Sequence, residues 1–146
     1  MFTSMSTGRR IFLAIEDDPI GAMLLGKLFK EAPPNAEFRL AVDGIEAIRY
    51  LEGKGRYADR VEFPLPDAIL LDINLPRFDG FDFLEWLRLK GPEPFRAMPV
   101  VVMSSSAMTE NVERGRALGI SAYLLKPPAK GSFWKELGKL GLLDAT

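Results

Sequence analysis

Four short apolar runs, each followed at once by charged or hydroxyl residues, constrain the fold of this chain more than any other feature. The runs have the length of β-strands and lack alternating polar residues, which is typical of parallel strands buried on both faces. Because the carboxyl ends of parallel strands meet at one edge, we expect these polar residues to share a small site. The runs cover residues 11–15, 68–71, 100–103 and 122–125, and Glu16-Asp17-Asp18, Asp72, Ser104-Ser105 and Lys126 follow them.

The segments between the apolar runs have helical spacing and begin with residues that favour helix starts. Asp18 before Pro19 supplies a cap and a first-turn proline, and Asp43 with Glu46 three residues later resembles a capping box. The apolar positions of the first helix are Ile20, Met23, Leu24 and Leu28. Helices are predicted to begin near residues 19, 44, 80, 107 and 132, and a weaker strand covers residues 37–42.

The pattern as a whole predicts the fold class. Residues 107–118 carry many charges and a thin apolar stripe, so we expect this helix to pack lightly. Residues 52–66 are rich in glycine, proline and charge, which predicts a surface loop. Five strands that alternate with helices predict a three-layer α/β fold with a doubly wound parallel sheet. The 146 residues fit one domain, which we place at residues 10–143 between tails at 1–9 and 144–146.

The composition excludes several classes of function. The chain has 19 basic and 20 acidic residues, so no basic surface for nucleic acid is expected. It has no histidine and no cysteine, which excludes a Ser-His-Asp triad and an ordinary zinc site. We see no long apolar run and no signal-peptide pattern, so we expect a cytoplasmic protein without membrane association. Two kinds of chemistry remain open to this chain: the binding of hard cations by carboxylates, and the attack of an aspartate on phosphorus.

The motifs, taken in order, resemble the receiver domain of two-component response regulators over nearly the whole chain. They are Ile-Glu-Asp-Asp-Pro at 15–19, Leu-Leu-Asp-Ile-Asn-Leu-Pro at 70–76, Asp-Gly at 79–80, Pro-Val-Val-Val-Met-Ser-Ser at 99–105 and Leu-Lys-Pro at 125–127. Residues 51–67 further resemble the stand-alone receivers that partner bacterial phytochrome kinases. The resemblance implies a flavodoxin-like sheet with the strand order 2-1-3-4-5.

The resemblance also implies that Asp72 is the phosphoacceptor and takes its phosphoryl group from the phosphohistidine of a sensor histidine kinase. It implies that Lys126 pairs with Asp72 and then with the phosphoryl oxygens, that the Ser104 hydroxyl hydrogen-bonds the phosphoryl group, and that Ser105 lies beside it. The bond between Lys126 and Pro127 is typically cis in receivers, which aims the lysine inward. Taken alone, Asp72 and the serines fit caps after strands, and Lys126 fits a surface lysine.

Glu16 and Asp17 beside Asp72 put three carboxylates in one site, and crowded carboxylates require a cation. Two like charges about 4 Å apart repel by roughly 4 kcal/mol at an effective dielectric constant near 20. Mg²⁺ fits, because it prefers octahedral oxygen coordination, keeps several waters and bridges to phosphate oxygens. We expect Asp17 to bind the ion most directly with Asp72, Glu16 to act through water, and the backbone carbonyl of Asn74 to add a neutral ligand. Asp18 is assigned to helix capping.

Tyr123 matches the aromatic switch position of receivers. We expect phosphorylation to draw the Ser104 hydroxyl inward and Tyr123 to follow into the vacated space, which changes the face formed by residues 107–125 and the last helix. A half-buried tyrosine without a switching role is the plainer interpretation. The resemblance also implies that the signal leaves through protein contacts, that the kinase is of the phytochrome type, and that the chain forms a homodimer.

Two other functions stay open on the sequence alone. A receiver fold that serves only as a binding scaffold is disfavoured by the intact Glu16, Asp17, Asp72 and Lys126. A phosphatase of the haloacid dehalogenase type also uses an aspartate, a lysine and Mg²⁺, but it has a second aspartate where this chain has Asn74. We therefore predict a single-domain response regulator that changes conformation on phosphorylation and loses the group by self-catalysed hydrolysis, rather than an enzyme acting on other molecules.

Overall fold

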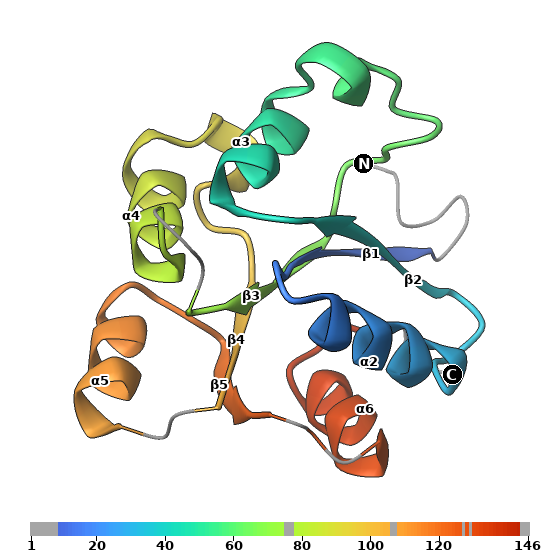
Figure 1. Ribbon diagram of the computed structural model, residues 1–146, viewed down its shortest axis with the longest axis vertical. Coiled ribbons are helices and arrows are strands. Elements are labelled where there is room, and N and C mark those ends of the chain that lie inside the picture. The colour runs from blue at the N-terminus through green and yellow to red at the C-terminus, as the bar shows by residue number, and fades with distance from the viewer. Residues whose placement is uncertain (1–8, 75–77, 106–107, 127, 129, 144–146) are drawn as a thin grey trace.

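The computed structural model describes residues 9–74, 78–105, 108–126, 128 and 130–143, and within them five parallel strands form one sheet. The order across the sheet is β2-β1-β3-β4-β5, which confirms the predicted order (Figure 1). Every neighbouring pair is parallel. The strands are β1 (Arg10–Ile15), β2 (Ala36–Ala41), β3 (Ala68–Asp72), β4 (Val100–Ser104) and β5 (Ala122–Leu125).

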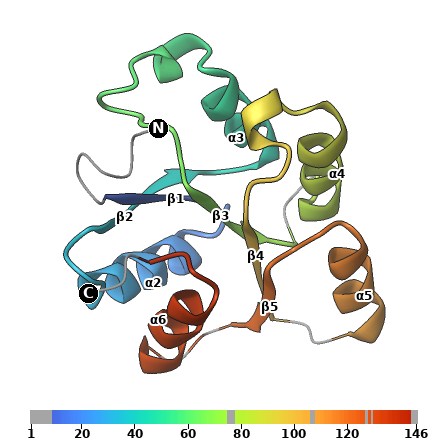
Figure 2. The ribbon, with the colours of Figure 1, turned by 180° about the vertical axis from the view of Figure 1, so that it is seen from behind.

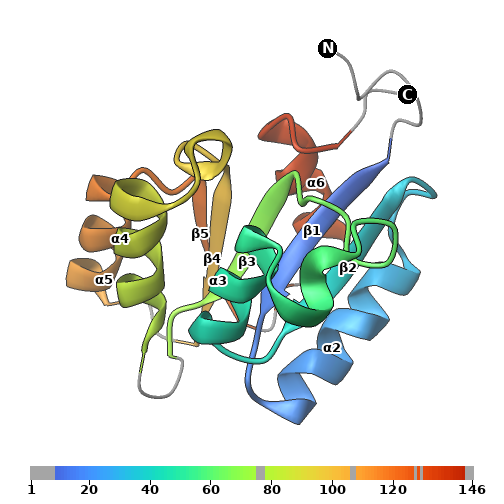
Figure 3. The same cartoon turned by 90° about the horizontal axis from the view of Figure 1, so that it is seen from above.

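Helices cover both faces of the sheet, so that the domain has three layers. On one face lie α2 and α6, and on the other lie α3, α4 and α5, as the two opposite views show (Figures 1 and 2). Figure 3 shows the strands running side by side in one direction, with the ends of β1 and β3 at the same edge. The helices are α2 (Pro19–Lys30), α3 (Gly44–Glu52), α4 (Gly80–Lys90), α5 (Thr109–Ala117) and α6 (Lys130–Lys139).

Each face of the sheet has its own apolar core. Alternate residues of β1 point to opposite faces, so Leu13 and Ile15 pack under α3 and α4, whereas Phe12 and Ala14 pack under α2 and α6. Phe12, Leu13 and Ala14 have no exposed surface. This double burial explains why the apolar runs in the sequence are continuous. It also fixes the positions of the strand ends that carry the polar residues.

The predicted helix starts at Asp18 and Asp43 are confirmed, with one correction. The Asp18 side chain accepts a hydrogen bond from the Ile20 backbone N–H at 3.1 Å, and Pro19 is the first residue of α2. Asp43 accepts one from the Glu46 N–H at 2.8 Å. The reciprocal half of that capping box is not among the described hydrogen bonds, and the Glu46 carboxylate instead accepts one from the hydroxyl of Tyr57 at 2.7 Å.

The apolar residues of α2 do not all face the core. Leu25 and Leu28 are buried, whereas Ile20, Met23 and Leu24 are 63%, 53% and 44% exposed. Helical spacing predicts that such residues share one side of a helix, but it does not say how far the sheet beneath extends. The first turns of α2 therefore present apolar side chains to the surroundings, beside the edge where β1 ends.

The segment between α3 and β3 is more ordered than the predicted loop. It contains a short 3₁₀ turn at Gly55–Ala58, and the turn's Tyr57 is only 1% exposed. The Tyr57 ring lies 5.2 Å from the Tyr50 ring and 5.0 Å from the Phe63 ring, measured between centroids. These aromatic contacts anchor the segment to the face of the sheet that α3 covers. Among the described residues, no helix has the length and apolar character needed to cross a membrane.

The central strand supplies a test of the fold. Leu13→Ala removes a side chain with no exposed surface and leaves a cavity between β1 and the helices above it. We expect the free energy of unfolding in urea to fall by about 2–5 kcal/mol. Leu89→Ala, at a leucine of α4 that is 71% exposed, should change it by less than about 0.5 kcal/mol. Equal effects of the two substitutions would contradict the described core.

Candidate functional site

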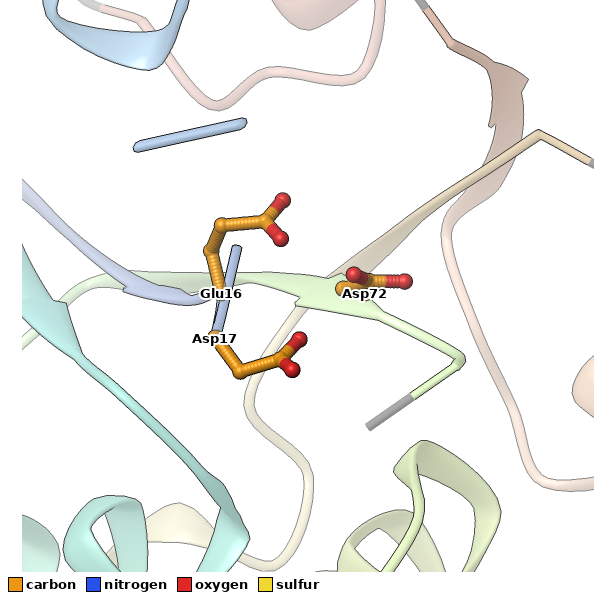
Figure 4. A group of neighbouring side chains, drawn as sticks. All are labelled: Glu16, Asp17 and Asp72. Atoms are coloured by element: carbon orange, nitrogen blue, oxygen red, sulfur yellow. The ribbon is translucent and has the colours of Figure 1, made fainter. Parts of the chain in front are cut away.

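Polar side chains from the ends of four strands converge at the carboxyl edge of the sheet. Asp72 is the last residue of β3 and Ser104 is the last residue of β4, whereas Glu16 follows β1 and Lys126 follows β5. Figure 4 shows Glu16, Asp17 and Asp72 gathered where β1 and β3 end. The parallel sheet brings these residues together because it aligns the strand ends, which are far apart in the sequence.

Lys126 makes the most direct contacts in the site. Its Nζ donates a hydrogen bond to Glu16 Oε1 at 2.5 Å and another to Asp72 Oδ2 at 3.1 Å. Its backbone N–H donates to the carbonyl of Ser104 at 2.8 Å, which ties the end of β5 to the end of β4. The contact with Asp72 is the one predicted from the sequence. The shorter contact, with Glu16, was not predicted.

The three carboxylates lie close enough together to hold one cation. One carboxylate oxygen each from Glu16, Asp17 and Asp72 lies within 4.8 Å of the other two. Glu16 and Asp72 are 3% and 8% exposed, whereas Asp17 is exposed. Three carboxylates against one ammonium leave the site with negative charge, and oxygen donors are what Mg²⁺ prefers. The donor set therefore fits a hard divalent ion.

The pKa values of Glu16 and Lys126, which form the shortest ion pair of the site, are both raised. Burial raises the pKa of Glu16, and the nearby charge of Asp72 adds to this, while the hydrogen bond from Lys126 works against it. Burial alone would lower the pKa of Lys126. The hydrogen bond to Glu16 and the charges of Asp72 and Glu16 outweigh burial, so the pKa of Lys126 is raised. The ammonium form is therefore favoured at this edge.

The remaining predicted site residues lie around this centre. Asn74 is exposed just after β3, and its backbone N–H donates to Asp72 Oδ1 at 2.9 Å. Ser104 is fully buried, whereas Ser105 is exposed. Tyr123 is partly buried, sits opposite Val102 in the β4–β5 register and packs against the core under α4. Pro127 lies outside the described residues, and so does the predicted cis bond.

The prediction that the helix at 107–118 packs lightly is confirmed. Gly115 is the one buried residue of α5 among those described. The helix also contacts α4 through Arg114, whose guanidinium lies 4.3 Å from the centroid of the Phe81 ring and 3.3 Å from the Glu85 carboxylate. Such partly exposed contacts hold a helix weakly compared with a buried apolar face. A shift of α5, the helix that precedes the strand of Tyr123, therefore costs little free energy.

The chain belongs to the response regulator receiver domain family, because its residues 12–137 match the model of that family. Response regulator Rcp1 from Synechocystis is 30% identical over 117 residues, which cover 80% of this chain and 76% of Rcp1. The chain is therefore a receiver domain of two-component signalling, and the family agrees with the strand order and with the acidic edge described above.

Solved structures of response regulators resemble this chain over nearly their whole length. The bacteriophytochrome response regulator AtBRR is 32% identical with a TM-score of 0.79, over 94% of this chain and 96% of its own. The Mn²⁺-bound form of Rcp1 is 27% identical with a TM-score of 0.73, over 94% of this chain and 97% of its own. The phosphorylated cyanobacterial regulator RcpA is 26% identical with a TM-score of 0.73, over 90% and 91%.

The ion pairs of Lys126 predict a pH-dependent stability. Lys126→Met leaves two neighbouring carboxylates without their ammonium, so we expect the free energy of unfolding to fall by roughly 2 kcal/mol at pH 7. The pKa of Lys126 is raised by folding, so its contribution is complete below its unfolded pKa of about 10.5. The contribution disappears as the pH rises through the higher folded pKa.

Urea unfolding between about pH 7 and pH 11 measures this effect as the difference between the parent and Lys126→Met. The difference in the free energy of unfolding should narrow above about pH 10.5. Lys135→Met, at an exposed lysine of α6, should be as stable as the parent over the whole pH range. A parent and a Lys126→Met variant of equal stability at pH 7 would show that the two ion pairs do not stabilise the fold.

Proposed function

We propose that this receiver domain accepts a phosphoryl group on Asp72, with Mg²⁺ bound beside it, from the phosphohistidine of a sensor histidine kinase. One observation carries the proposal. Asp72 Oδ2 lies 3.1 Å from the ammonium of Lys126, and an Asp72 oxygen lies within 4.8 Å of oxygens from both Glu16 and Asp17. A nucleophilic carboxylate between an ammonium and a cation-binding pair suits a reaction that gathers negative charge on phosphoryl oxygens.

The residues divide the chemistry between them. An oxygen of Asp72 attacks phosphorus, the bond between phosphorus and the kinase imidazole nitrogen breaks, and its electron pair stays on the imidazole. Lys126 neutralises the phosphoryl oxygens on one side. Asp17, Asp72 and the Asn74 carbonyl are the proposed ligands of Mg²⁺, with Glu16 next to them, and the bound ion supplies the second positive charge. Ser104 and Ser105 are the proposed hydrogen-bond donors to the phosphoryl group.

The phosphoryl group leaves by hydrolysis. A water oxygen attacks phosphorus, the bond to the Asp72 oxygen breaks, and inorganic phosphate departs while the carboxylate is restored. The chain thus catalyses only the turnover of its own modification, as suits a signalling protein. Two relatives support this chemistry by what their structures hold, since RcpA is phosphorylated and Rcp1 carries Mn²⁺.

The partner must cover the carboxyl edge of the sheet, because the phosphohistidine has to reach Asp72. That edge carries exposed apolar side chains, which an interface can bury. The similarity to phytochrome response regulators supports a kinase of the phytochrome type. That two copies of this chain form a homodimer is a further prediction. The exposed apolar residues at or just after the strand ends include Ile20, Met23, Leu24, Val42, Ile45, Met108 and Leu125.

The phosphoryl group can be detected directly. Incubation with a small-molecule phosphodonor and Mg²⁺ should add the mass of one phosphoryl group to the intact protein. Asp72→Asn should abolish the gain, because an amide oxygen is a poor nucleophile. Asp59→Asn, in the segment before β3, should leave it unchanged. Removal of Mg²⁺ by a chelator should slow the gain by at least about tenfold, since the ion neutralises the transferred charge.

Each rival function predicts a different outcome of the same experiment. No mass gain in the parent would favour a receiver fold that serves only as a binding scaffold. A gain that survives Asp72→Asn would mean that another residue is the acceptor. Turnover of a small phosphate ester faster than the protein loses its own phosphoryl group would favour the phosphatase.

We further propose that Ser104 and Tyr123 transmit the change to the face made by α5 and β5. Tyr123 is partly buried on β5, and α5, the helix that precedes this strand, packs lightly, so α5 can shift at a low cost when the tyrosine rotates. With beryllofluoride and Mg²⁺ as a phosphoryl mimic, crystal structures should show Tyr123 in a more buried rotamer than without it. Asp72→Asn under the same conditions should not change. The same rotamer in the presence and absence of the mimic would exclude the switch.

A further inference from the structure

Glu16 is almost completely buried, although it lies at the solvent-open edge of the sheet. It is 3% exposed, although it directly follows the end of β1. Its Oε1 accepts the hydrogen bond from Lys126 Nζ at 2.5 Å, and its Oε2 accepts one from the backbone N–H of Asp18 at 3.2 Å. The carboxylate thus lies between Lys126 and the start of α2, where a side chain of the helix would ordinarily project.

Gly21 is what leaves this space open. It is the third residue of α2, and a Cβ added to it would lie 2.5 Å from Glu16 Cδ, 2.6 Å from Oε1 and 2.9 Å from Oε2. A Cβ does not approach the atoms of another side chain this closely, so a side chain at residue 21 would displace the Glu16 carboxylate. Glycine is also a poor helix former, so its presence here costs stability.

We propose that Gly21 is a positioning residue of the phosphoryl-accepting site: without a side chain, it lets Glu16 hold Lys126, so that one ammonium is shared between Glu16 and Asp72. This inference deepens the proposed function of Asp72 and rests on it. The arrangement keeps Lys126 from pairing with Asp72 alone. It also keeps a Glu16 oxygen within 4.8 Å of oxygens from Asp17 and Asp72.

A methyl group at residue 21 should weaken the binding of a divalent ion for two reasons. The displaced Glu16 carboxylate leaves the cluster that attracts the ion. Lys126, without Glu16, pairs with Asp72 alone, and the ion must then compete with a complete ion pair for the Asp72 oxygens. We expect Gly21→Ala to weaken Mn²⁺ binding by about fivefold, which corresponds to the loss of one partly exposed charge contact.

Gly26 supplies a matched control in the same helix. A Cβ added to Gly26 meets no atom within 4 Å, so Gly26→Ala makes the same chemical change on α2 without touching Glu16. Both alanines favour the helix, and Gly26→Ala should raise the melting temperature. Isothermal titration calorimetry with MnCl₂ compares the parent with both variants, and Gly26→Ala should bind Mn²⁺ as the parent does.

A second background separates positioning from a general effect on the helix. Glu16→Asp shortens the side chain by one methylene and draws its carboxylate back from residue 21. In that background Gly21→Ala should cause no further loss of Mn²⁺ affinity, so the two substitutions are not additive. Should Gly21→Ala fail to fold alone, the double variant should fold, because the carboxylate no longer meets the methyl group.

Several results would overturn the inference. Binding of Mn²⁺ by Gly21→Ala that is as tight as binding by Gly26→Ala, or tighter than binding by the parent, would contradict the role of Gly21. The same is true if Gly21→Ala causes the same loss of affinity in both Glu16 backgrounds, or if the double variant does not fold. A parent that accepts a phosphoryl group while the two glycine variants bind alike contradicts only the role of Gly21. A parent that binds Mn²⁺ in the expected pattern but gains no phosphoryl group contradicts only the proposed function, and a parent that binds no Mn²⁺ contradicts both.

Discussion

The site depends on one ammonium group placed among three carboxylates. Lys126 lies 110 residues from Glu16 and 54 residues from Asp72 in the sequence, yet its Nζ contacts both. Carboxylates this close repel one another, and partial burial removes much of the water that would screen them. The cluster can form only if positive charge reaches it. Lys126 supplies one such charge from the protein, and the remaining negative charge suits the binding of a divalent ion.

The sheet makes this arrangement possible. β4 lies between β3 and β5, so Lys126 must extend past the end of β4 to reach Asp72. Its backbone is held in place by the hydrogen bond to the Ser104 carbonyl. Two apolar cores fix the strands from both sides, so the strand ends keep their positions while the polar residues stay at the edge. The strands below are rigid and α5 beside them is loosely held, which suits the proposed function, in which the domain accepts a phosphoryl group and then changes conformation.

Much of this could be predicted from the sequence, because buried parallel strands leave an unmistakable pattern. The run at 122–125 coincides with β5, and Asp72, predicted to follow its strand, is the last residue of β3. The meeting of Glu16, Asp72 and Lys126 follows from the alignment of strand ends. The pairing of Lys126 with Glu16 could not be predicted, because it depends on the direction of a side chain and on the space at Gly21.

Other features stayed hidden for equally physical reasons. Periodicity assigns Ile20 and Met23 to one side of α2 but cannot show that the sheet ends before it covers them. Tyr57 stands in a segment rich in glycine and charge, and its burial depends on how this segment folds back so that Tyr57 meets Tyr50 of α3 and Phe63. In each case the sequence specifies the element, whereas the way the chain packs in three dimensions determines what the element buries or exposes.

A crystal soaked in MnCl₂ and measured at the manganese absorption edge tests the central claim most directly. An anomalous peak is expected beside the carboxylates of Asp17 and Asp72, with the ammonium of Lys126 on the other side of Asp72. A map without a peak at this edge of the sheet, or one in which Lys126 points away from Asp72, would contradict the claim that these groups form one cation-assisted phosphoryl-accepting site.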